Sequence, residues 1–135
     1  MLSFLDRTPQ ELEPRARLLL AGLRIWLAER RQGRCPIWPL RAAFTRLGQT
    51  GALWPLHNFL SWTLAHATRP IGMGCFCGPA ADDEALLLAA MLAPDETQAR
   101  AALADLVAEH ALSRAVRCSR SVGAEFGARV APLRG

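Results

Sequence analysis

Lysine and tyrosine are absent from this chain of 135 residues, and histidine occurs only three times. All 16 basic residues are therefore arginines, and together with abundant Ala, Leu and Gly this bias predicts a GC-rich bacterial genome. Arginine content by itself then says little about phosphate recognition, although the guanidinium group suits that role. No alternating apolar–polar run of any length is present, which argues against a β-sheet.

The sequence also shows no pattern typical of a secretory signal or of a membrane-spanning helix. The start, Met1–Arg7, has neither a basic region nor a sustained apolar region. Four cysteines without such a signal predict reduced thiols and a cytoplasmic location rather than a disulfide framework. Residues 47–68 carry no charge, but glycines, a proline and polar side chains interrupt them, so we expect no membrane contact.

Acidic residues are lacking from residues 30–81, which hold six arginines. Residues 82–109 hold seven acids and one arginine, whereas 110–135 hold five arginines and one acid. The segments can neutralise one another within the chain or across a second subunit. A sharper alternative is an anion-binding face.

The spacing of apolar residues predicts one all-α domain over residues 1–135, a compact bundle of about five helices. The first helix is expected to begin after Thr8, with Pro9 at its first position, and to end at Gly33. Residues 118–135 form either the end of the domain or an irregular tail. The helices are expected at about 9–31, 39–47, 55–68, 82–93 and 95–117.

A short motif occurs twice, as Ile37-Trp-Pro-Leu40 and Leu53-Trp-Pro-Leu56. Each proline is expected to open a helix, with the preceding tryptophan extended and packed back on it. We therefore assign the aromatic residues of this region to the core rather than to a ligand cage. They are Trp38, Trp54, Phe59 and Trp62.

Self-association is expected because some apolar faces exceed what one small bundle can bury. Leu18 and Ile25 form a second stripe on the first helix, and residues 85–92 are apolar all round. The stripe predicts a homodimer, and the helix over 85–92 is expected either in the middle of the structure or in a subunit interface. His110 is assigned to the buried face of the last helix.

The segment from Arg69 to Pro79 predicts a Gly/Cys-rich loop in the middle of the chain, because three glycines lie between two prolines. It presents Cys75 and Cys77. In one interpretation these are buried small side chains and no cofactor is expected. In the other they bind zinc as thiolates, with a tetrahedral set completed from elsewhere in the chain. The candidate further ligands are Cys118, His66 and Cys35.

These patterns favour a small non-enzymatic binding or regulatory protein that self-associates. An enzyme is not expected, since no serine lies in a nucleophile-elbow context. The alternative is a metal-binding or thiol-redox protein that uses Cys75 and Cys77. A third hypothesis is a nucleic-acid-binding regulator, in which Leu112-Ser113 opens a recognition helix that bears Arg114, Arg117 and Arg120; the turn glycine of a helix-turn-helix is missing, so nucleic acid is not the expected partner.

Overall fold

The structure, a computed structural model, describes residues 12–75 and 78–130, with the backbone but not the side chains of 127–130. Six α-helices and one short 3-10 helix occupy these residues, which confirms the all-α expectation. The only β feature within them is an isolated bridge between Ala67 and Val107. The elements are α1 (Pro14–Arg31), α2 (Ile37–Arg46), η3 (Thr50–Ala52), α3 (Leu53–Ala65), α4 (Asp82–Leu92), α5 (Glu96–Leu103) and α6 (Glu109–Val130).

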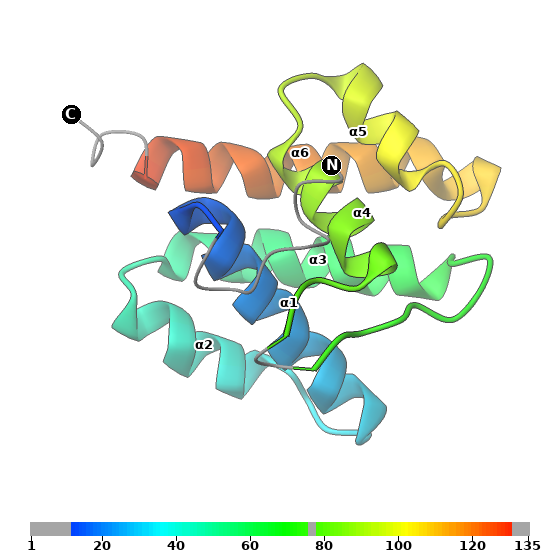
Figure 1. The fold of residues 1–135 in the computed structure, drawn as a ribbon. Coiled ribbons are helices and arrows are strands. Elements are labelled where there is room, and N and C mark those ends of the chain that lie inside the picture. The colour runs from blue at the N-terminus through cyan, green and yellow to red at the C-terminus, as the bar shows by residue number, and fades with distance from the viewer. Residues whose placement is uncertain (1–11, 76–77, 131–135) are drawn as a thin grey trace.

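The longest helix, α6, packs along α3, and α1 crosses in front of them (Figure 1). Helix α4 lies between α1, α5 and α6, so its apolar surface is covered on several sides, as its sequence predicts. Helix α5 covers the first part of α6 at the top of the molecule, while α2 lies at the bottom beside α1. No helix in the described part of the chain has the length and apolar character that crossing a bilayer requires.

The core is built from all the helices, with Trp26, Phe44, Phe59 and Phe126 fully buried. Rings of Phe44 and Phe126 meet edge to face with centroids 6.3 Å apart, so α2 and α6 share this core. The stripe of Leu18 and Ile25 is half-buried and packs on the same core. Much of the apolar surface that predicted a homodimer is thus covered within one chain, and self-association remains a prediction.

Helix α1 begins later than expected. Its first residue is Pro14, and Glu13 caps it from an extended conformation by accepting a hydrogen bond from the Ala16 amide at 3.3 Å. A residue before proline is disfavoured in the helical region, so Pro14 interrupts the expected helix at Glu13. Thr8 and Pro9, the expected start, lie outside the described residues.

The two Trp-Pro motifs adopt one conformation, but not the expected one. In α2 and α3 the helix starts two residues before the proline, which occupies the third position. The first amides of a helix need no intrahelical acceptor, so proline is tolerated there. Each tryptophan consequently projects from a first helical turn. Trp38 is 70% exposed and Trp54 is 50% exposed, so their assignment to the core was wrong.

The expected helix over 95–117 is two helices. Between them, Ala108 donates to the His66 carbonyl and Thr68 donates to the Leu106 carbonyl, both at 2.9 Å. These bonds to the chain leaving α3 satisfy backbone groups that a continuous helix would have used. Helix α6 then runs to Val130, so residues 118–130 are not an irregular tail. His110 is exposed rather than buried.

Candidate functional site

Arg24 holds the segment between α3 and α4 from inside the molecule. Its side chain is 1% exposed, and its Nε and Nη2 donate to the two carboxylate oxygens of Glu84, both at 2.9 Å. Further bonds reach the Gly78 carbonyl at 3.1 Å and the Pro79 carbonyl at 2.9 Å. One buried guanidinium on α1 therefore fixes both the start of α4 and the chain that leads into it.

A second ion pair holds the other end of this segment. Arg69 donates two hydrogen bonds of 2.8 Å to the carboxylate of Asp83, which also accepts from the Gly72 amide at 2.6 Å. The hydrogen bonds from Arg69 lower the pKa of Asp83, assisted by the Gly72 amide and opposed by burial. Arg31 of α1 donates to the Ile71 carbonyl at 2.9 Å. Asp83 and Glu84, two acids in the first turn of α4, are thus partners of arginines.

The predicted zinc ligands occupy different surroundings. Cys75 is exposed, Cys118 is half-buried against the core, and Cys77 lies outside the described residues. His66 stacks on Trp62 and hydrogen-bonds the Trp62 carbonyl through Nδ1 at 3.0 Å. Among the described residues no three His, Cys, Asp or Glu side chains form a group that could hold a metal ion. The zinc site therefore remains a prediction for elemental analysis to test. Cys35, its other candidate ligand, is exposed.

An aromatic stack joins α3 to α6 near His66. The Trp62 and His66 rings have centroids 3.9 Å apart, and His110 meets His66 edge to face at 5.6 Å. The guanidinium of Arg114 lies 4.1 Å from the Trp62 ring centre. This arginine, one of the three proposed to contact nucleic acid, is thus engaged within the chain. Leu112 and Ser113 lie inside α6 and do not open a helix.

A serine and a histidine also lie together, yet their hydrogen bonds oppose catalysis. The Trp26 indole donates to His57 Nδ1 at 3.0 Å, and Ser61 Oγ lies 3.4 Å from His57 Nε2. An indole N–H can only donate, so Nδ1 carries the lone pair and neutral His57 has its proton on Nε2. Nε2 then donates to Ser61 instead of accepting its proton. Burial, with a smaller contribution from Arg30, lowers the pKa of His57.

The most unusual surface is formed by α2 and the start of α3. We call it the aromatic–arginine face: Trp38, Arg41, Arg46, Leu47 and Trp54. Trp38, Trp54 and the half-exposed Leu47 are the only large apolar side chains that stand exposed in the described ranges. The Arg41 guanidinium lies 5.4 Å from the Trp38 ring centre. Beside Trp54 is a cavity of about 260 Å³ whose lining includes Phe44 and Leu53.

The sequence contained part of the signal for this face. Residues 30–81 have no acid, so no carboxylate of that segment neutralises Arg41 or Arg46. The exposure of the tryptophans was missed because a Trp-Pro pair indicates a helix start and does not indicate which side of that helix is covered.

No protein-family model, curated protein or solved structure matches this chain.

Proposed function

We propose that this chain is a non-enzymatic binding protein that self-associates, and that the aromatic–arginine face is its contact surface. The observation that carries the proposal is that Trp38 and Trp54 are both exposed, while Arg41 lies against Trp38 and lines a cavity together with Trp54. Tryptophan and arginine are enriched among the residues that dominate binding energy at protein interfaces. Exposing two tryptophans and a leucine together is costly for a monomer, since apolar surface is more stable away from water.

The partner surface we infer is the groove between α4 and α5 of a second copy. This groove has a volume of about 360 Å³ and is lined mainly by apolar side chains, including Ala89, Leu92 and Ala101. Asp95 and Glu96 are exposed beside it at the start of α5. An aromatic side chain flanked by arginines complements an apolar groove flanked by carboxylates.

Two arginines near the groove would repel the arginines of the aromatic–arginine face if they were unpaired. Arg100 pairs with Glu96 at 3.6 Å, and Arg120 donates to the Ala93 carbonyl at 2.9 Å. Both are engaged within the chain. Of the seven acids in the segment from 82 to 109, Asp83 and Glu84 are paired with Arg69 and Arg24. Five acids remain against Arg100, so the charge of the segment remains opposite to that of the aromatic–arginine face.

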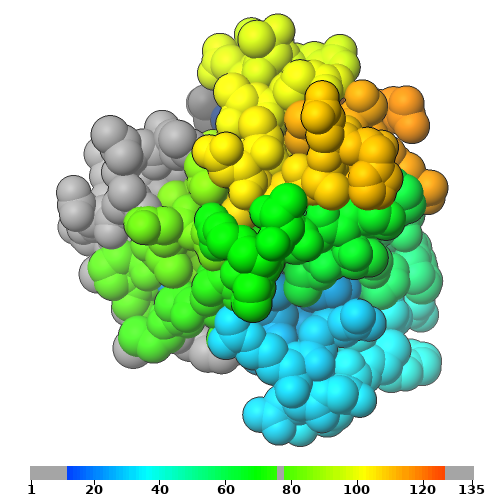
Figure 2. Space-filling view, turned by 90° about the vertical axis from the view of Figure 1, so that its right-hand side faces the viewer, coloured from blue at the N-terminus to red at the C-terminus, as the bar shows by residue number. Residues whose placement is uncertain are grey.

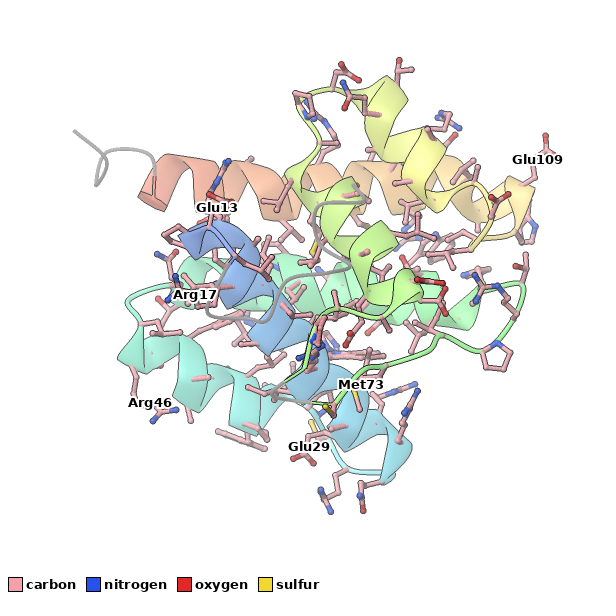
Figure 3. All side chains as sticks on the ribbon, viewed as in Figure 1. Glu13, Arg17, Glu29, Arg46, Met73 and Glu109 are labelled. Carbon is pink, nitrogen blue, oxygen red and sulfur yellow. The ribbon has the colours of Figure 1, made fainter. Side chains whose placement is uncertain are left out.

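The two surfaces lie at opposite ends of the molecule, which sets the kind of assembly. Figure 1 places α2 at the bottom and α5 at the top, and Figure 3 shows Arg46, at the end of α2, at the lower left of the same view. Contact between two aromatic–arginine faces would bring arginines against arginines. We therefore propose a head-to-tail contact, in which the face of one copy binds the groove of the next.

A mixing experiment tests this arrangement. Trp38→Asp removes the face, and Ala101→Arg fills the groove and adds a repelling charge. Each variant alone is expected to be monomeric by light scattering, whereas the wild type grows with concentration. An equal mixture is expected to form a dimer and nothing larger, because each variant keeps one intact surface that matches the other.

Ala21→Asp serves as the control, since Ala21 is exposed on α1 and belongs to neither surface. It should associate like the wild type, and circular dichroism should show unchanged helix content in all variants. A wild type that stays monomeric at millimolar concentration overturns the proposal of self-association. A mixture that stays monomeric, or Ala101→Arg alone forming the wild-type assembly, overturns the head-to-tail contact.

A further inference from the structure

A cationic cavity lies where the ends of α1 and α3 meet the chain that follows α3. Its volume is about 390 Å³, and its lining includes three arginines and three larger apolar side chains. Figure 2 shows the face on which these segments meet, with the end of α1 in light blue below the green stretch after α3. The lining residues used below are Leu27, Leu64 and Ile71, with Arg30, Arg31 and Arg69.

Two of the arginines fix the walls of the cavity. Arg31 donates to the Ile71 carbonyl at 2.9 Å, which ties the end of α1 to the chain opposite. Arg69 is held by its two hydrogen bonds to Asp83. Both guanidinium groups are thus oriented before any ligand arrives, which reduces the entropy cost of binding.

Arg30 differs from these two. Its guanidinium lies 5.2 Å from the centre of the Trp26 ring, and in the described part of the chain no carboxylate pairs with it. Arg69 is paired with Asp83 and has Asp82 and Asp105 nearby, so the excess positive charge at this cavity comes from Arg30 and Arg31. A concave surface with excess charge of one sign attracts ligands of the other sign.

The floor is apolar, which narrows the class of ligand. Leu27 and Ile71 are buried in the core, and Leu64 packs on it. A strongly hydrated inorganic anion leaves such a floor unused, whereas a hydrocarbon tail covers it. The volume falls in the range of ordinary small-molecule sites, about 300–1,000 Å³.

We infer that this cavity binds a small amphipathic anion, a carboxylate with a short hydrocarbon tail. The carboxylate lies against Arg30 and Arg31, and the tail lies against Leu27, Leu64 and Ile71. This assigns a ligand class to the proposed binding protein, at a site separate from the aromatic–arginine face.

Titration calorimetry with octanoate tests the inference, and three related probes resolve its parts. Octylamine has the same tail and the opposite charge, octanol has the tail alone, and inorganic phosphate has charge without a tail. Octanoate is expected to bind with a stoichiometry of one per chain. Its dissociation constant is expected to be lower than that of each of the other three probes. Equal binding of phosphate indicates charge alone and overturns the amphipathic assignment, and so does equal binding of octanol.

Arg30→Gln is expected to weaken octanoate binding by about tenfold, since it removes the arginine without a carboxylate partner. The matched control is Arg34→Gln, because Arg34 is also an exposed arginine, lies just after the end of α1, and lines neither the cavity nor a proposed contact surface. If Arg30 acts only as a positive charge near the end of a helix, both substitutions should change the octanoate dissociation constant by the same small factor. Unchanged binding in Arg30→Gln, or no saturation at millimolar octanoate, overturns the site.

The same titration on monomeric Trp38→Asp separates the two proposals. Octanoate binding is expected to equal that of the wild type, since Trp38 does not line the cavity. Binding by a protein that never self-associates overturns only the assembly. Self-association without octanoate binding overturns only the ligand site.

Discussion

The His57 side chain contacts three other side chains, one on α1 and two on α3. It accepts from the buried Trp26 indole, lies 3.4 Å from Ser61, and meets the exposed Trp54 ring edge to face with centroids 5.7 Å apart. The indole donor fixes the neutral tautomer. A proton added to Nδ1 would face the Trp26 N–H, so protonation breaks a hydrogen bond that links α1 to α3.

Stability should therefore fall as the pH is lowered through the ordinary histidine pKa of about 6.5. The folded pKa of His57 is lowered, so between the two values the unfolded chain binds more protons than the folded chain. The free energy of unfolding consequently rises with pH in that window and is fully retained above it. Urea unfolding between neutral pH and mild acid measures this.

His57→Gln should show a smaller loss over the same range, whereas His110→Gln, at an exposed position, should behave like the wild type. A wild type whose stability rises on acidification in this window contradicts the assignment of a neutral His57.

Single residues differed in how far the sequence predicted them. The stack of His66 on Trp62 follows from local spacing, because residues four positions apart at the end of a helix lie about one turn from each other. The burial of Trp38 was predicted wrongly, because burial depends on which helix covers a given face. The Arg24–Glu84 pair was missed entirely, since 60 positions separate its members and neither lies in a motif.

At the scale of elements, Arg24 couples three parts of the chain: α1, the start of α4 and the segment before it. The Glu84 carboxylate also accepts from the Ala81 amide at 2.8 Å, so the pair lies within a small hydrogen-bonded network. Breaking a buried pair from one side leaves an uncompensated charge, which costs far more than breaking an exposed pair.

Arg24→Met is therefore expected to lower the free energy of unfolding by about 3–5 kcal/mol. The control, Arg34→Ala, removes the exposed partner of Glu29 and should cost less than about 1 kcal/mol. Adding Glu84→Met to Arg24→Met should recover part of the loss, because the unpaired carboxylate is then gone. Urea unfolding of the four proteins gives the comparison, and equal costs for Arg24→Met and Arg34→Ala contradict it.

The end of a helix could be predicted where a local sequence signal ends it. It could not be predicted where hydrogen bonds to residues distant in the sequence end it. Gly33 and Gly48 adopt positive φ values of 72° and 70° after α1 and α2, near the expected ends. The break between α5 and α6 has no such residue. It arises from hydrogen bonds to His66 and Thr68, which the apolar spacing of residues 95–117 does not indicate.

At the scale of the whole molecule, the proposed contact joins a groove with exposed acids beside it to a face with exposed arginines, and this gives the proposed assembly a distinct response to salt. The acids beside the α4–α5 groove and the arginines beside Trp38 are exposed, so salt screens their attraction. Apolar contacts between tryptophan and the groove are not weakened in this way.

Self-association should consequently weaken with added sodium chloride and yet persist. Between about 0.05 and 0.5 M salt we expect the dissociation constant to rise by roughly tenfold, because the Debye length shrinks to a few ångströms. Sedimentation velocity over a concentration series measures it. In Arg41→Gln/Arg46→Gln the association should be weaker at low salt and nearly independent of salt, since the face then lacks the charges that salt screens. An association that strengthens with salt in the wild type indicates an apolar interface, such as one through Leu18 and Ile25, and contradicts the contact between the aromatic–arginine face and the groove.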